Sequence, residues 1–98
     1  MSPPVVLINA FEVPPDADDE FLSAWEAARD HLETQPGYVD TALHRALSPE
    51  AAFRYVNVAR WESAQHFDSA RQSPEFRQSA GGLAGFPSHP ALYEIVRT

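Results

Sequence analysis

The order in which hydrophobic periodicity changes along the chain constrains its fold more than any other sequence feature. Strands show a period of two residues, and amphipathic helices show a period of about 3.6. The predicted strands cover residues 5–13, 38–47, 52–61 and 91–96, and the predicted helices cover residues 16–35 and 63–79. The resulting order, βαββαβ, is that of the ferredoxin-like α+β fold, in which an antiparallel sheet carries both helices on one face.

Turn and cap residues mark the ends of these segments. Pro14-Pro15 ends the first strand, and Pro36-Gly37 ends the first helix, since proline cannot continue a helix and glycine suits the reversal. Ser63 is a predicted N-cap, and Ser73-Pro74 looks like a second helix start, so the second helix is expected to break in two. One apolar stripe runs along the first helix: Phe21, Trp25, Ala28 and Leu32.

Length and composition limit the classes of function. The 98 residues fit a single domain over residues 1–98. A net charge of −7 opposes binding to nucleic acid or to an anionic membrane. There is no cysteine, hence no thiolate nucleophile or thiolate metal ligand. We find no apolar run near the roughly 20 residues of a membrane span and no signal-peptide pattern, and we expect a soluble, cytoplasmic protein whose partner is a small molecule or a protein.

Two asparagines interrupt apolar strand faces. Alternate residues of the 53–61 segment share one face: Phe53, Tyr55, Asn57, Ala59 and Trp61. An aromatic row with one carboxamide is how a pocket for a flat, partly polar molecule would be lined. Asn9 occupies a similar place in the first strand, among Val5, Leu7 and Phe11. Each asparagine could instead satisfy a strand edge or bridge two subunits, and the sequence leaves this structural alternative open.

The two helices would cover only one face of the sheet. On the uncovered face we place a set of large apolar residues: Val5, Leu7, Phe11, Phe53, Tyr55, Trp61, Tyr93 and Ile95. Such a face is too apolar to leave in water. We therefore predict a homodimer that packs sheet against sheet and leaves a cavity on that face, between sheet and helices or loops.

Four segments of the chain are typical of one known family. They are INAFEV at 8–13, QPGYV at 35–39, YVNVARWES at 55–63 and SPEF at 73–76. On these segments the chain resembles the antibiotic biosynthesis monooxygenase family, whose members are small dimeric α+β barrels, over nearly its whole length. More specifically, the trio Asn9, Asn57 and Trp61 is similar to that of the cofactor-independent anthrone oxygenases of aromatic polyketide pathways.

The resemblance implies an enzyme that oxidises a small aromatic, such as an anthrone or a hydroquinone-like polyketide intermediate, to a quinone with O2. It implies no flavin, haem or metal. Most of the reactivity belongs to the deprotonated substrate, so the protein must hold an anion and exclude water. On this reading the N–H groups of Asn9 and Asn57 stabilise the oxyanion, while Trp61 supplies a stacking ring and an indole N–H donor.

Six further residues are expected to bind the substrate: Leu7, Phe11, His44, Phe53, Tyr55 and Phe67. Phe67 is included through the resemblance, because some family members carry tyrosine there. His44 is the best placed of the four histidines to accept a substrate proton, since its strand neighbours residues 53–61. The histidines otherwise lack the spacing of a metal site, so we predict no metal.

The alternative function is a noncatalytic dimer of the same fold that binds haem or an aromatic metabolite. The family also contains haem-degrading enzymes, whose site combines an asparagine, a tryptophan and a histidine. Asn9 matches the first of these, but the other two positions fall on Ala70 and Ala80. Without an axial imidazole, haem loses its iron ligand. Haem degradation is therefore disfavoured, and no cofactor is predicted.

Overall fold

Strands and helices follow one another in the predicted βαββαβ order, with the second helix divided. The computed structural model describes residues 4–98. Its strands are β1 (Val5–Phe11), β2 (Tyr38–Arg45), β3 (Tyr55–Trp61) and β4 (Ser88–Tyr93), and its α-helices are α1 (Asp18–Leu32), α2 (Ala64–Arg71) and α3 (Pro74–Ser79). Two short 3₁₀ turns, η1 (Pro15–Ala17) and η2 (Gly81–Leu83), lead into α1 and follow α3.

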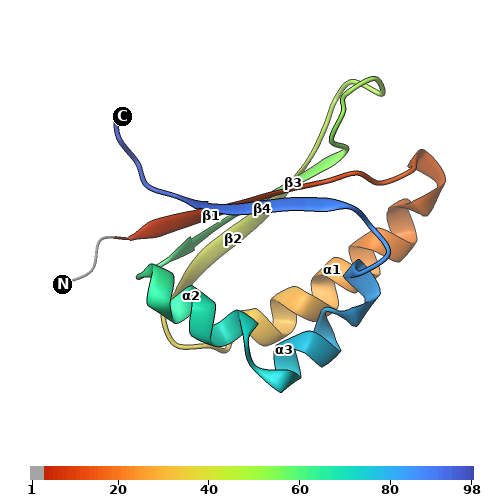
Figure 1. Cartoon of the computed structure of the whole chain (residues 1–98). Helices are drawn as coiled ribbons and strands as arrows, with labels where there is room; N and C mark the ends of the chain where they lie inside the picture. The colour runs from red at the N-terminus through yellow and green to blue at the C-terminus, as the bar shows by residue number, and fades with distance from the viewer. Residues whose placement is uncertain (1–3) are drawn as a thin grey trace.

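The strands form one antiparallel sheet in the order β2-β3-β1-β4. All three α-helices lie on the same side of this sheet, as Figure 1 shows. This is the predicted ferredoxin-like arrangement, and it is confirmed. Within residues 4–98, no helix is long and apolar enough to cross a membrane.

The predicted break in the second helix is also confirmed. Ser63 caps α2 by accepting a hydrogen bond from the His66 N–H at 3.2 Å. Ser73 caps α3 in the same way, accepting from the Phe76 N–H at 3.1 Å. These caps satisfy N–H groups that have no partner inside the helix.

All four strands differ from their predicted ranges, and β1 and β2 end at Phe11 and Arg45 rather than at residues 13 and 47. The strand β3 begins at Tyr55 rather than residue 52, and β4 covers residues 88–93 rather than 91–96. The pairing of β1 with β4 extends to Ser88, so it includes Pro90. The predicted strand excludes Pro90, but β4 is an edge strand, and edge strands tolerate a residue without an N–H.

The large apolar residues expected on the uncovered side of the sheet mostly face the helices instead. The buried residues form two core clusters on that side: Phe11, Val13, Phe21, Tyr55 and Phe86 in one, and Leu7, Ala59, Trp61 and Ala70 in the other. The uncovered side carries the alternate residues of the central strands: Val6, Ile8, Ala10, Val56 and Val58. Our assignment of the two faces was therefore wrong for five residues: Val5, Leu7, Phe11, Tyr55 and Trp61. Strand alternation separates two sets of residues, but it does not say which set the helices cover.

A β-bulge near the start of β2 changes which residues face the helices. Tyr38 pairs with Trp61, whereas Asp40 pairs with the next residue of β3, Arg60. The extra residue brings Tyr38 to the same side of the sheet as Thr41. In a strand without a bulge, alternation would place Tyr38 on the side of Asp40 instead.

An ion pair links the start of β3 to the start of α1. Arg54 donates from Nε and Nη2 to the two carboxylate oxygens of Asp18, with both distances 2.7 Å. The hydrogen bonds from Arg54 lower the pKa of Asp18 to about 2. The two side chains are only 24% and 23% exposed, so water screens this pair less than an open surface pair.

We expect Asp18→Asn to lower the free energy of unfolding at neutral pH, and to lower it much less near pH 2. Because the folded-state pKa lies below the ordinary value of 3.8, ionised Asp18 stabilises the fold above that value. This contribution is lost as the pH falls through about 4 towards about 2. Urea unfolding across this range tests the prediction, with Asp19→Asn as the control on the same helical turn. Parallel pH profiles for Asp18→Asn and the wild type would contradict it.

Candidate functional site

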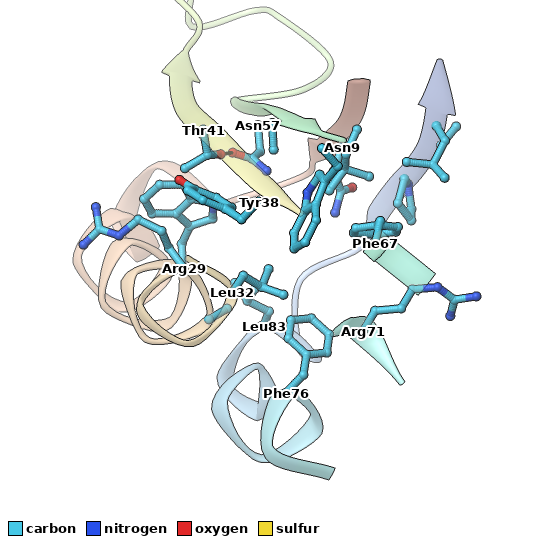
Figure 2. Close-up of a pocket in the computed structure, with 18 of the residues that line it drawn as sticks. Asn9, Arg29, Leu32, Tyr38, Thr41, Asn57, Phe67, Arg71, Phe76 and Leu83 are labelled. Carbon is cyan, nitrogen blue, oxygen red and sulfur yellow. Dashed lines mark hydrogen bonds between the residues drawn. The ribbon is translucent and has the colours of Figure 1, made fainter. Parts of the chain in front are cut away.

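A cavity of about 430 Å³ lies between the sheet and the helices (Figure 2). Its volume is in the range of small-molecule sites, which are typically apolar with a few polar groups. Much of the wall is aromatic or aliphatic, including Leu7, Phe11, Trp25, Leu32, Phe67 and Phe76. In Figure 2 the labelled asparagines lie on the sheet side of this space, and Phe76 and Leu83 lie on the helix side.

The structure brings the two predicted asparagines to the same wall. The strands β1 and β3 pair so that Asn9 lies directly opposite Asn57. Both side chains line the cavity and are half-buried. The chain contains two asparagines. Their carboxamides therefore lie side by side in a wall that is otherwise largely apolar.

Hydrogen bonds occupy the oxygen of each carboxamide. The backbone N–H of His89 donates to Asn9 Oδ1 at 3.1 Å, and the hydroxyl of Thr41 donates to Asn57 Oδ1 at 2.8 Å. Within residues 4–98, neither Nδ2 group donates a hydrogen bond. The amide nitrogens are thus left as donors at the wall, and such donors can stabilise a negatively charged oxygen.

Trp61 adds a third donor at the same site. Its side chain is almost completely buried, at 1% exposure, and its ring packs edge-on against Tyr38 and Phe67 with centroid distances of 5.6 Å. The indole N–H has no hydrogen-bond partner within the described residues. A buried donor without a partner is uncommon in proteins, and an oxygen of a bound molecule beside Trp61 would supply one.

Three of the six expected substrate-binding residues line the cavity: Leu7, Phe11 and Phe67. Tyr55 does not line it, because its ring is buried against Phe21 with a centroid distance of 4.6 Å. Phe53 lies before β3, is 38% exposed and packs against His89 outside the cavity. The 53–61 row is therefore divided between core, cavity and surface.

His44 is not near the cavity. It lies on β2 opposite Val56, on the uncovered side of the sheet, and its side chain is exposed. Its Nδ1 is 3.3 Å from the carbonyl oxygen of Val56. Neighbouring strands bring two residues together only when they share a face, so our expectation that His44 accepts a substrate proton is not supported by its position.

Several cavity residues were missed by the sequence analysis, and two of them are polar residues of one strand. Thr41 and Tyr38 both come from β2 and line the cavity. The bulge determines the side of the sheet that Tyr38 faces, and no sequence signal for it was recognised. Burial raises the pKa of Tyr38, which keeps its phenol protonated and able to donate a hydrogen bond.

Two arginines lie at the rim of the cavity. Arg29 binds Asp30 at 2.9 Å, and Arg71 binds Asp68 at 3.0 Å. Figure 2 shows both guanidinium groups directed away from the cavity. The two arginines therefore do not place their charges in the interior of the cavity.

The described residues do not offer an evident metal or haem ligand set. Between residues 4 and 98, no group of three or more His, Cys, Asp or Glu side chains could hold a metal ion. No histidine, cysteine or methionine of this part of the chain lines the cavity. Ala70 is buried inside α2, and Ala80 follows α3. Neither of these alanines can serve as an axial haem ligand.

Comparison with protein families gives a clear match. Residues 4–81 match the family model described as antibiotic biosynthesis monooxygenase. A curated relative, the mycobilin-producing heme oxygenase of Mycobacterium tuberculosis, is 35% identical over 81 residues, which are 83% of this chain and 75% of that protein.

Solved structures show the same fold. A candidate monooxygenase from Shewanella loihica is 43% identical, with a TM-score of 0.88 over 100% of this chain and 99% of that one. SnoaB, a cofactor-independent oxygenase from Streptomyces nogalater, is 28% identical, with a TM-score of 0.86 over 99% of this chain and 97% of that one.

Proposed function

The chain belongs to the antibiotic biosynthesis monooxygenase family, and from this premise we propose that it is a cofactor-independent oxygenase. Its substrate would be a small anthrone or hydroquinone-like aromatic, and its product a quinone. The observation that carries this proposal is the pair Asn9 and Asn57, which present N–H donors beside Trp61 in a largely apolar cavity. The similarity to SnoaB supports the same reaction class.

The oxidation of an anthrone balances without an external reductant. Its CH2 group first loses a proton, and the resulting phenolate-enolate anion passes an electron to O2. One oxygen atom of O2 then forms the new C=O group. The other oxygen leaves as water with the two hydrogens of the CH2 group. The protein therefore needs to bind the anion and exclude water rather than to supply electrons.

The cavity residues match these requirements. Carboxamides are not bases at neutral pH, but their N–H groups stabilise oxyanions. Asn9 and Asn57 would hold the oxyanion, and Trp61 would stack on the substrate and donate to a substrate or peroxide oxygen. A largely apolar wall strengthens each of these contacts because it lowers the local dielectric constant.

Turnover of dithranol, a dihydroxyanthrone, under isotopically labelled O2 tests the proposal. We expect quinone formation well above the uncatalysed rate, with one labelled oxygen atom in each product molecule. The protein should first be treated with chelator and shown by absorbance to be free of flavin. Failure of this protein to accelerate the reaction would contradict the proposal.

A second candidate is a noncatalytic dimer that holds haem or an aromatic metabolite. The identity of 35% to a heme oxygenase favours this candidate. The positions Ala70 and Ala80 and the absence of a cavity histidine in residues 4–98 count against iron ligation. In a haemin titration we expect no shifted Soret band. A saturable shift would make the second candidate the better one.

We also propose that the chain forms a homodimer through the uncovered side of its sheet. Val6, Ile8, Val56 and Val58 give this side an apolar centre, and Tyr93 beside them is 51% exposed. A second copy would remove this area from water.

Val58→Glu is expected to convert the dimer to a monomer, because it places a charge at the centre of the apolar face. Light scattering coupled to size exclusion measures the change in mass. Ser69→Glu, on the exposed surface of α2, is the matched control and should remain dimeric. A monomeric wild type would refute the dimer, and a dimeric Val58→Glu variant would refute this interface.

A further inference from the structure

We propose that Thr41 is a positioning residue that holds the Asn57 carboxamide with its N–H donors towards the cavity. The cavity would then select ligands that present an oxyanion or carbonyl oxygen to β3. This inference rests on the proposed function for its catalytic consequence. The orientation of Asn57 itself can be tested without any activity.

The contact that carries the proposal lies at the wall of the cavity. Thr41 Oγ1 is 2.8 Å from Asn57 Oδ1 and 3.4 Å from the carbonyl oxygen of Val58. A hydroxyl has one proton to donate, and the shorter contact is the stronger hydrogen bond. Figure 2 shows Thr41 and Asn57 side by side above Tyr38.

The orientation of an amide matters because its two ends are similar in size but opposite in function. With Thr41 donating to Oδ1, the Asn57 nitrogen remains available as a donor. A flipped amide would present oxygen lone pairs to the ligand, and these repel a negatively charged oxygen. With Thr41 Oγ1 donating to Oδ1, Asn57 therefore presents an N–H group rather than lone pairs to an oxyanion.

The two asparagines are oriented in different ways. Asn9 Oδ1 accepts from a backbone N–H, that of His89. A backbone N–H can only donate, so this partner fixes the amide regardless of the side chain at residue 89. The partner of Asn57 is instead a side-chain hydroxyl, so a substitution of Thr41 can remove it. The same substitution leaves the partner of Asn9 in place, so Asn9 serves as an internal control.

The register of the sheet explains why Thr41 can do this. Thr41 pairs with Ala59, and Leu43 pairs with Asn57. Thr41 is thus the diagonal neighbour of Asn57 on the cavity side, within reach of its side chain. This register is unbroken from Asp40 to Arg45, beyond the bulge.

The test compares Thr41→Val, which removes the hydroxyl at nearly constant shape, with Thr41→Ser, which keeps it. Because the chain contains only Asn9 and Asn57, asparagine-selective labelling gives two side-chain amide signals. In the ligand-free protein, we expect Thr41→Val to move the Asn57 side-chain carbonyl carbon signal upfield as its hydrogen bond is lost. The Asn9 signal should stay in place, and Thr41→Ser should resemble the wild type.

Kinetics with dithranol then measure the catalytic consequence. We expect Thr41→Val to lower kcat about tenfold with little change in KM, since an oxyanion donor acts mainly in the transition state. Thr41→Ser should retain most of the activity. An unchanged Asn57 carbon signal in Thr41→Val would overturn the positioning role, even in an active enzyme. A shifted signal with an inactive wild type would support the positioning role and refute the oxygenase proposal.

Discussion

Asn57→Ala is expected to lower kcat for quinone formation by about a hundredfold or more. Removal of one preorganised donor to an oxyanion typically costs roughly 3–4 kcal/mol in the transition state. The amide nitrogen of Asn57 is available as such a donor, because the amide oxygen accepts the hydrogen bond from Thr41. Its loss should affect KM less, since charge on the substrate oxygen develops mainly as the reaction proceeds.

Initial rates measured by absorbance at several dithranol concentrations separate kcat from KM. Gln65→Ala is the matched control, because it removes an exposed carboxamide from α2 and should leave both constants unchanged. Asn9→Ala should also reduce kcat, and the double variant should lose less than the two single losses combined if both amides bind one oxygen. Wild-type kinetics in Asn57→Ala would show that this amide has only a structural role.

Gly37→Ala is expected to destabilise the fold by roughly 3 kcal/mol. Gly37 has a φ of +88°, a conformation that residues with a Cβ adopt only with strain. A Cβ at this position would also lie 2.3 Å from Cγ and 2.4 Å from Cβ of His66. The second atom is close to the backbone of α2, so a change of side-chain rotamer cannot relieve the overlap.

Urea unfolding at neutral pH measures this loss. Gly85→Ala is the control, because a Cβ there has no neighbour within 4 Å among the described residues. The overlap with the Cβ of His66 predicts that Gly37→Ala remains strongly destabilising in a His66→Ala background. A loss below about 1 kcal/mol would mean that the chain accommodates the new Cβ by a small shift of α2.

Local sequence signals predicted the order of elements and several of their ends. Ser63 and Ser73 cap helices as expected, because capping depends on a few adjacent residues. The antiparallel ferredoxin-like sheet followed from the order of periodicities. The two asparagines could be recognised because each interrupts an apolar strand, and the register then placed them opposite one another.

The features that sequence reasoning missed depend on contacts between distant segments. Alternation separated the two sides of the sheet, but packing against α1 and α2 decided that Tyr55 and Trp61 face the helices. The bulge in β2 then brought Tyr38 into the cavity, and the register beyond it placed Thr41 beside Asn57. His44 lies on the side of β2 that the helices do not cover. The cavity lies on the covered side, so His44 is away from it. A single residue of shift in a strand reverses such assignments.

Oxygen uptake by chelator-treated, flavin-free protein supplied with dithranol is the measurement that tests cofactor-independent oxygenation most directly. After subtraction of the uncatalysed rate, we predict uptake of one O2 for each quinone formed, proportional to wild-type protein concentration and nearly abolished in Asn57→Ala. Uptake that appears only after flavin, haem or metal is added would contradict cofactor independence. Equal uptake in the wild type and Asn57→Ala would contradict the assignment of the reaction to this cavity.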